Sequence, residues 1–214
     1  MLLFSFVAHE YAHVYAALRQ GDPTGYQVGR LTWNPLPHID PFFSIVLPLM
    51  SLYFGGFIFG GPKPAPVVAR NFRHYKRGDI IVSLAGVTAN VTIGVVAAVL
   101  VFVFGLLGGA LPALATTCAI LQQMALLAVR INFFLAAFNL LPIPPLDGSH
   151  VAKYLLPPAW ALQYQRIGQY GFLVLFAFLT FGGRFLYAWM TPALVAIATV
   201  HSSAAPYLLA PPWS

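Results

Sequence analysis

Apolar segments of membrane-spanning length recur along this sequence and constrain its fold more than any other feature. A helix needs about 20 mainly apolar residues to cross the hydrocarbon core of a bilayer. Six candidate segments lie at 1–18, 42–59, 80–107, 114–141, 170–190 and 192–209. The sequence therefore predicts an all-α membrane protein, a polytopic helical bundle of about six transmembrane segments joined by short extended or re-entrant loops.

Charged residues are too scarce for most classes of soluble protein. The chain of 214 residues has 11 Lys+Arg and 5 Asp+Glu, 7% of its length, against roughly 25% in an ordinary soluble domain. So few charges cannot cover the surface of a soluble globule, which excludes a cytosolic enzyme and a disordered chain. The lipid bilayer is therefore the expected environment. The single cysteine, Cys118, excludes an intrachain disulfide and is expected to be a packing residue.

The net charge of +6 does not indicate nucleic-acid binding, because the basic residues are clustered. The loop 62–79 carries five basic residues and one aspartate, a net charge of +4 (5 − 1). Short loops rich in Lys and Arg remain on the cytoplasmic side of a membrane. We therefore expect a multi-pass protein of the cell membrane, with this loop in the cytoplasm and no nucleic-acid partner. Met1 opens directly on an apolar run, so no removable signal peptide is expected.

The pattern His-Glu-x-x-His lies in the middle of the first apolar segment, at His9, Glu10 and His13. Histidines four positions apart share one face of a helix, so both imidazoles can reach one metal ion. In zinc proteases with this pattern, the glutamate is the general base beside the metal. Glu10 is the only glutamate of the chain, and a charge at membrane depth costs on the order of 3 kcal/mol or more. The alternative is a polar helix face that hydrogen-bonds to its neighbours.

Two histidines leave a catalytic zinc ion one protein ligand short. Asp147 follows a proline-rich run after a long apolar segment and precedes Gly148, a context that can aim a carboxylate back into the bundle. Taken alone, it would cap the helix that starts near Gly148; taken with the His-Glu-x-x-His pattern, it is the preferred third ligand. His150 is the rival candidate. The other aspartates lie in linkers beside Pro or Gly, where solvated turns are the expectation: Asp22, Asp40 and Asp79.

Other polar features favour ordinary structural roles. We expect the side chains of His38 and His74 to be solvated and that of His201 to lie at the membrane interface. Arg130, within an apolar segment, would snorkel, pair with a carboxylate or line a watery cavity. The stretch 26–33 is expected either to form a short strand pair or to lie at the membrane interface. A strand there would offer its free edge to an extended substrate.

Four motifs resemble the site-2 protease family of intramembrane zinc metalloproteases, peptidase family M50. They are AHEYAH at 8–13, NPLPHIDP at 34–41, SLAGVTAN at 83–90 and NLLPIPPLDG at 139–148. The resemblance is closest to the short forms that lack PDZ and CBS domains. It covers about 1–155, and implies one integral-membrane metalloprotease domain over 1–214. The catalytic core would be about 1–155, with additional transmembrane helices at about 168–210.

The resemblance also implies roles for individual residues. His9, His13 and Asp147 match the ligands of one Zn²⁺ per chain, and Glu10 matches the general base. Two asparagines, Asn139 and Asn90, match positions linked to the substrate or the oxyanion. The sequence departs from the family where Val87 replaces a usual proline and where the stretch before His9 is short.

The function expected from these features is hydrolysis of peptide bonds in membrane-spanning or membrane-associated proteins, with the active site toward the cytoplasm. The alternative is a membrane metal-binding or metal-transport protein that uses the same ligands without hydrolysis. A transporter would be expected to show several metal-binding groups along a path, whereas this chain shows one cluster. A haem protein is disfavoured because His9 and His13 share a face of one helix. No serine has a context that indicates a serine protease.

Overall fold

The computed structural model describes residues 1–53, 60–211 and 213, and these residues form helices, turns and extended segments without any β-strand. A π-helical turn (Pro41–Val46) leads directly into α3, and short 3₁₀ turns join several of the other helices. The α-helices are α1 (Leu2–Gln20), α2 (Thr24–Gln27), α3 (Leu47–Tyr53), α4 (Tyr75–Ala110), α5 (Ala115–Asn139), α6 (Asp147–Ala152), α7 (Pro158–Ile167), α8 (Gly171–Phe181) and α9 (Gly183–Ala204).

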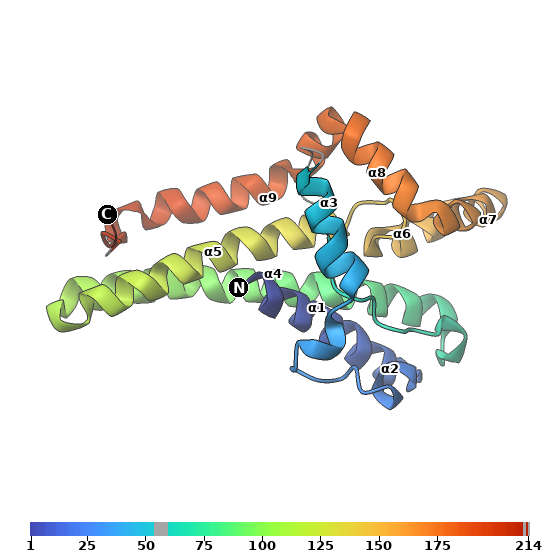
Figure 1. Ribbon diagram of the computed structural model, residues 1–214, viewed down its shortest axis with the longest axis horizontal. Coiled ribbons are helices and arrows are strands. Elements are labelled where there is room, and N and C mark those ends of the chain that lie inside the picture. The colour runs from blue at the N-terminus through green and yellow to red at the C-terminus, as the bar shows by residue number, and fades with distance from the viewer. Residues whose placement is uncertain (54–59, 212, 214) are drawn as a thin grey trace.

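The long helices α4 and α5 form the centre of the bundle (Figure 1). They are joined by a tight 3₁₀ turn (Pro112–Leu114) and pack against each other over most of their length. On one side α1 lies across α4, and on the other α9 runs back along α5. Apolar side chains fill these contacts; Val101, Leu126 and Ala204, for example, belong to one buried cluster.

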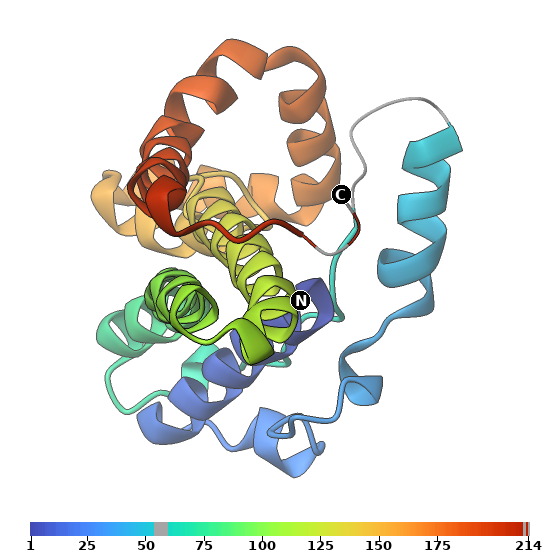
Figure 2. The ribbon, with the colours of Figure 1, turned by 90° about the vertical axis from the view of Figure 1, so that its left-hand side faces the viewer.

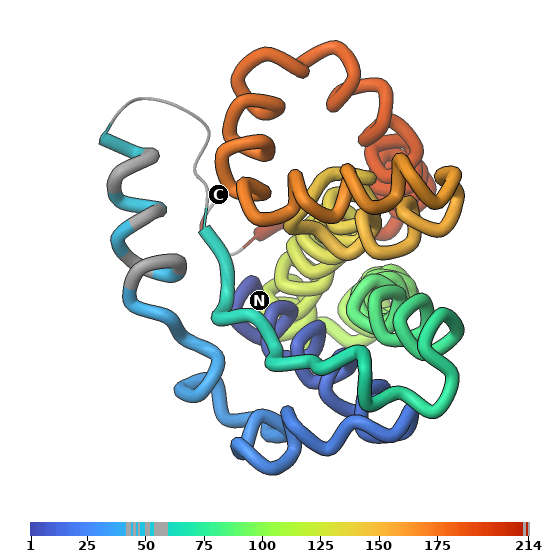
Figure 3. The backbone as a smooth tube through the Cα atoms, turned by 90° about the vertical axis from the view of Figure 1, so that its right-hand side faces the viewer, coloured from blue at the N-terminus to red at the C-terminus, as the bar shows by residue number. Residues whose placement is uncertain are grey.

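Two parts of the chain extend away from this centre. The backbone of α3 stands to one side of the bundle in both end views (Figures 2 and 3). Helices α7 and α8 lead outward before α9 returns (Figure 1). The proline-rich loop between α5 and α6 is anchored on α8 by the buried side chains of Leu141, Leu146 and Leu175. This loop carries α6 back toward α1 and α4, which positions the site described below.

Three helical stretches of the described residues are long and apolar enough to cross a membrane: Tyr75–Ala110, Pro112–Asn139 and Gly183–Tyr207. They agree with three of the six predicted segments, so the membrane character is supported and the number six is not confirmed. The first segment forms α1, which has 19 residues but carries His9, Glu10 and His13 in its apolar run. The second ends in residues 54–59, which lie outside the described residues.

The two predicted C-terminal segments have a different boundary in the structure. We expected a break between 190 and 192, but Pro192 lies inside α9, and the break falls at Gly182, between α8 and α9. Gly182 and Gly183 are consecutive, and glycine is a poor helix former. Proline is tolerated within membrane helices, where neighbouring groups compensate for the missing N–H. The helix therefore continues through Pro192 and is interrupted at the glycine pair.

Of the two alternatives for 26–33, the strand pair is contradicted, because no strand forms there. Residues 24–27 form the short helix α2, and Gly29 then takes a positive φ of 73°, which turns the chain. The N–H of Arg30 donates to the carbonyl of Gly25 and closes this turn. An extended segment does approach the site, but it lies at 61–66, where proline alternates with other residues.

Three side chains that we expected to be solvated are buried. His38 is 2% exposed, and its Nε2–H donates to the carbonyl of Thr32. Asp22 is 1% exposed and accepts hydrogen bonds from neighbours described below, although it does form the expected turn. Asp79 is 4% exposed and lies in an ion pair. Polar residues beside Pro and Gly are usually solvated; here longer-range partners replace water, and a linear pattern does not show such partners.

Candidate metal centre

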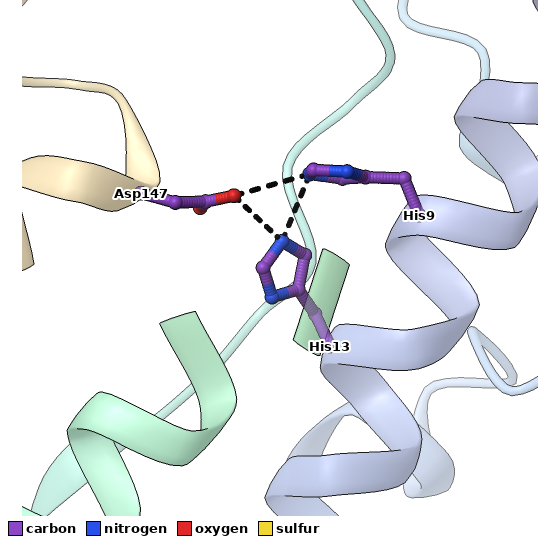
Figure 4. A group of neighbouring side chains, drawn as sticks. All are labelled: His9, His13 and Asp147. Carbon is purple, nitrogen blue, oxygen red and sulfur yellow. Dashed lines mark hydrogen bonds and ion pairs between the residues drawn. The ribbon is translucent and has the colours of Figure 1, made fainter. Parts of the chain in front are cut away.

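The two histidines of α1 and the aspartate at the start of α6 converge on one point (Figure 4). His9 and His13 lie one helical turn apart, and their Nε2 atoms are 3.0 Å from each other. One carboxylate oxygen of Asp147, Oδ2, lies 3.2 Å from the Nε2 atom of each histidine. The three ligand atoms lie within 4.8 Å of one another. Residues separated by 134 positions (147 − 13) therefore meet at a single candidate metal site.

A backbone carbonyl of α4 determines the tautomer of His13. The Nδ1 atom of His13 lies 2.7 Å from the carbonyl oxygen of Val82. Because a carbonyl oxygen can only accept, Nδ1 must carry the proton and donate it. In a neutral imidazole the other nitrogen, Nε2, then has a free lone pair. That lone pair faces Asp147, as expected for a histidine that binds a metal through Nε2.

Gly86 of α4 makes room for the two imidazoles. A Cβ atom at this position would lie 2.5 Å from Nε2 of His13 and 2.6 Å from Nε2 of His9. Real Cβ atoms essentially never come this close to other atoms. Glycine is therefore the residue that allows α4 to approach both ligands, which explains why a small residue stands here in a long helix.

Glu10 is held by an extended segment from a distant part of the chain. Its side chain is 7% exposed, and its Oε2 atom accepts a hydrogen bond of 2.8 Å from the N–H of Ala65. In 61–66, prolines occupy every second position from Pro62 to Pro66, so few N–H groups remain as donors. The alternating prolines thus favour an extended backbone with one N–H directed at the glutamate.

Arg30 fixes this extended segment in place. The guanidinium group is 5% exposed and donates to the carbonyl oxygens of Pro37, Lys63 and Pro64. A buried guanidinium is stabilised only when its donors are satisfied, and here backbone carbonyls take the place of a carboxylate. The next N–H after these carbonyls is the one that Glu10 accepts. Arg30 therefore connects the loop after α2 to the side chain predicted to be the general base.

The donor set fits a zinc ion. Two imidazole nitrogens and one carboxylate oxygen are the three-ligand set typical of catalytic zinc, which keeps a fourth position for water or substrate. The lone pair of His13 Nε2 and the carboxylate of Asp147 face the same point. Glu10 follows His9 directly, although its described hydrogen bond is to Ala65. Together these groups can bind a Lewis acid and exchange a proton beside it.

The structure places the remaining predicted site residues around this centre rather than in it. Asn90 lies on α4 one turn after Gly86; it is completely buried, and its amide atoms have no hydrogen-bond partner among the described residues. Asn139 ends α5, and its amide donates to the carbonyl of Leu135. Their assigned roles stay predictions. His150 does not belong to the group formed by His9, His13 and Asp147. Its imidazole pairs with Asp79 instead, with Nδ1 3.4 Å from Oδ1.

The groups that support the predicted ligands and the predicted base could not be identified from the sequence. Val82 contributes only a backbone carbonyl and Ala65 only an N–H, so neither residue type carries a signal. Asp79 does carry one, because it is the only acid in the long apolar helix α4. Gly86 does not, because α4 contains several other glycines. Three helical positions separate Asp79 from Val82, and four separate Val82 from Gly86. That spacing puts them on one face of α4.

Comparisons with known proteins give the same assignment. The model of the family described as Peptidase family M50 matches residues 1–182. YwhC of Bacillus subtilis, whose name describes it as a zinc metalloprotease, is 36% identical over 176 residues, which are 81% of this chain and 75% of YwhC.

Two further relatives carry the same description. Rip2 of Mycolicibacterium smegmatis is 33% identical over 80% of this chain and 62% of its own length. MJ0611 of Methanocaldococcus jannaschii is 32% identical over 49% of this chain and 50% of its own length. The chain therefore spans between half and three quarters of these relatives. No solved structure matches it. Together with the three converging ligands, these similarities show that the chain belongs to peptidase family M50, the zinc metalloproteases of the site-2 protease family.

Proposed function

We propose that this protein binds one zinc ion through His9, His13 and Asp147 and hydrolyses peptide bonds of membrane-spanning or membrane-associated proteins. Glu10 is the general base in this proposal. The observation that carries it is the convergence of the three ligand atoms within 4.8 Å, in a chain whose described residues include three helical stretches long and apolar enough to cross a membrane. Family membership supports the same reaction class.

When bound, zinc supplies a Lewis acid that polarises the scissile carbonyl and makes water more acidic. Glu10 accepts the proton of the attacking water and later returns it to the leaving amine. The hydrogen bond from Ala65 to Oε2 restricts rotation of this carboxylate. The proton on Nδ1 of His13, which Val82 fixes, keeps that imidazole a ligand rather than a competing base.

The substrate must present an extended backbone, because a helix hides its amides from attack. A membrane-spanning substrate therefore has to unwind locally before Glu10 and the metal can act on it. We place the site toward the cytoplasmic side of the cell membrane in a multi-pass protein. Exposed basic residues just before the spanning helix α4 and in its first turn, among them Arg70, Arg73 and Lys76, support this orientation.

Two substitutions test the ligand set and the base separately. Protein purified in detergent should contain about one zinc ion per chain, and Asp147→Ala should lose most of it, because two ligands alone bind zinc weakly. Glu10→Gln should keep the zinc and lose cleavage by about 10²- to 10⁴-fold, the usual contribution of a general base. Zinc is measured by elemental analysis, and cleavage with a labelled single-span peptide that has glycines in its span.

Each result separates the protease from the metal-binding alternative. A wild-type protein that binds zinc without cutting any labelled peptide, with Glu10→Gln indistinguishable from it, would favour metal binding or transport. Full zinc content in Asp147→Ala would contradict the proposed ligand set. A peptide with an uninterrupted leucine span serves as the matched substrate, and we expect it to be cut more slowly because its helix resists unwinding.

A further inference from the structure

A buried ion pair lies just beyond the end of α6, the helix that begins with the metal ligand Asp147. The Nζ atom of Lys153, just after the end of α6, lies 2.5 Å from Oδ2 of Asp79 on α4. Lys153 is 9% and Asp79 4% exposed.

Neighbouring side chains complete the pair. The hydroxyl of Tyr154 donates to Oδ2 of Asp79 over 2.7 Å, and Nδ1 of His150 lies 3.4 Å from Oδ1. The ammonium of Lys153 also lies over the rings of Tyr154 and Tyr75, at 5.0 and 5.9 Å. Burial and the carboxylate of Asp79 raise the pKa of Tyr154, so its hydroxyl remains a donor. Asp79 thus holds three residues from α6 and the turn that follows it.

This arrangement places the metal ligand between two fixed points. At the first turn of α6, a Cβ on Gly148 would overlap the backbone of Leu140 and Leu141, so this turn is packed tightly against the end of α5. At the other end of α6, Asp79 holds Lys153 and Tyr154. Asp147 begins this helix, and Lys153 follows six residues later, about 9 Å along its axis. A helix this short has few other contacts that could fix its position.

The same face of α4 also contacts both histidines. Asp79 holds α6, the carbonyl of Val82 accepts from His13, and Gly86 packs against His9 and His13. The three α4 residues therefore set the distance between α1 and α6 at the metal centre. A buried pair that served only stability would have no need to lie at this junction, and replacing such pairs by apolar residues is often neutral for stability.

We propose that Asp79 and Lys153 are positioning residues, whose buried ion pair fixes α6 on α4 and so holds Asp147 at the distance that zinc binding requires. The inference rests on the proposed function, because it takes Asp147 as a ligand. Without Lys153, the carboxylate of Asp79 loses its positive partner in a buried place, where an unpaired charge is costly. The end of α6 then moves toward water, and Asp147 moves with it.

The test measures zinc affinity by competition with a chromophoric chelator in Lys153→Met, Asp79→Asn and the double variant. Groups that orient a metal ligand typically contribute 10- to 100-fold in affinity, so each single variant should bind zinc about 10- to 100-fold more weakly. Because the two residues act as one unit, their effects should not multiply. The zinc affinity of the double variant should lie within about threefold of the affinity of either single variant. Arg184→Met, which removes an exposed cation on α9, is the matched control and should bind zinc normally.

Two further readouts separate positioning from folding. The helix content and the thermal midpoint of the metal-free variants show whether the bundle is intact. The visible spectrum of the cobalt-loaded protein should change in Lys153→Met, because the carboxylate ligand is displaced while the histidines remain. If Lys153→Met or Asp79→Asn does not fold, the test uses Tyr154→Phe, which removes only the hydroxyl that donates to Asp79. Its zinc affinity, measured by the same competition, should then fall.

Wild-type zinc affinity in the folded Lys153→Met and Asp79→Asn variants would overturn the inference, as would losses that multiply in the double variant. Unchanged affinity in Tyr154→Phe would overturn it where the other variants do not fold. In each case Asp147→Ala still loses zinc, and the proposed function stands. Full zinc binding by Asp147→Ala would instead remove the ligand on which both proposals rest.

Discussion

At the scale of single residues, the metal centre depends on backbone groups as much as on side chains. The carbonyl of Val82 directs the proton of His13, and the N–H of Ala65 holds Glu10. Any residue except proline supplies an N–H, and every residue supplies a carbonyl. The three residues that converge could be named from the sequence, and their role as zinc ligands stays a prediction. These backbone partners could not be named, because no residue type marks them.

Gly86→Ala should weaken zinc binding by about 5- to 150-fold while the protein still folds. The added methyl group would lie 2.5 Å from the imidazole of His13, so α1 and α4 must separate locally. Overpacking of this kind typically costs about 1–3 kcal/mol, which is about 5- to 150-fold in affinity if it falls on the ligands. The measurement is zinc competition with a chelator, together with the thermal midpoint of the metal-free protein.

Gly109→Ala is the matched control for that substitution. Gly109 lies in the same helix, and no atom lies within 4 Å of the position of an added Cβ. Alanine is the better helix former by about 1 kcal/mol, so zinc affinity should be unchanged and the thermal midpoint equal or higher. Equal zinc affinity in Gly86→Ala and Gly109→Ala would show that α4 does not constrain the ligands.

At the scale of elements, the sequence predicted the helices that are long and apolar better than the connections between them. The predicted segments 80–107 and 114–141 correspond closely to α4 and α5. The expected strand at 26–33 is a helix and a turn, and α8 is only 11 residues long. Apolar periodicity and length identify a long helix, whereas short connections depend on tertiary partners that lie far away in the sequence.

The turn after α1 depends on one such partner, the carboxylate of Asp22. It accepts from the N–H and hydroxyl of Thr24, from the N–H of Val68 and from the amide of Asn71. Burial alone would raise the pKa of Asp22, but these hydrogen bonds outweigh it, and the pKa lies below its usual value. A depressed pKa stabilises the folded state above the unfolded pKa of about 3.9, and this contribution is lost as the pH falls through the folded value.

Asp22→Asn should therefore lower the thermal midpoint at pH 7, and the gap to the wild type should narrow below about pH 4. Hydrogen bonds to a charged group contribute about 1.5–3 kcal/mol, which sets the expected loss of stability. Thermal unfolding in detergent between pH 3 and pH 7 measures both effects. Thr24→Val removes only the hydroxyl donor of Thr24 and should show a smaller loss. A gap that stays constant with pH would mean that the carboxylate charge is not the stabilising feature.

At the scale of the whole molecule, α4 and α5 determine the topology. Each is long enough to cross a bilayer, and the turn Pro112–Leu114 joins them. In the topology that we propose, α4 crosses the bilayer, which puts the basic loop before it and this turn on opposite sides of the membrane. The number of other crossings could not be settled from the sequence, because α1 mixes an apolar run with the polar residues of the metal site.

Cysteine labelling in sealed cells tests that topology. In a Cys118→Ala background, which removes the single native cysteine, Lys76→Cys should react only with a reagent that enters the cytoplasm. Ala113→Cys, an exposed position in the α4–α5 turn, should react with an impermeant reagent from outside. Both should react after the membrane is dissolved in detergent, which is the control. Labelling of both positions from the same side would mean that α4 does not cross the bilayer.

One face of α4 contacts both α6 and the imidazoles of His9 and His13, and this limits changes in the length of the helix. Inserting or deleting one residue between Asp79 and Gly86 would rotate everything beyond it by about 100°. The face would then be divided, and no repacking of single side chains would restore Asp79, Val82 and Gly86 to one line. Length changes should therefore be excluded from this stretch of the helix, even where many individual substitutions are accepted.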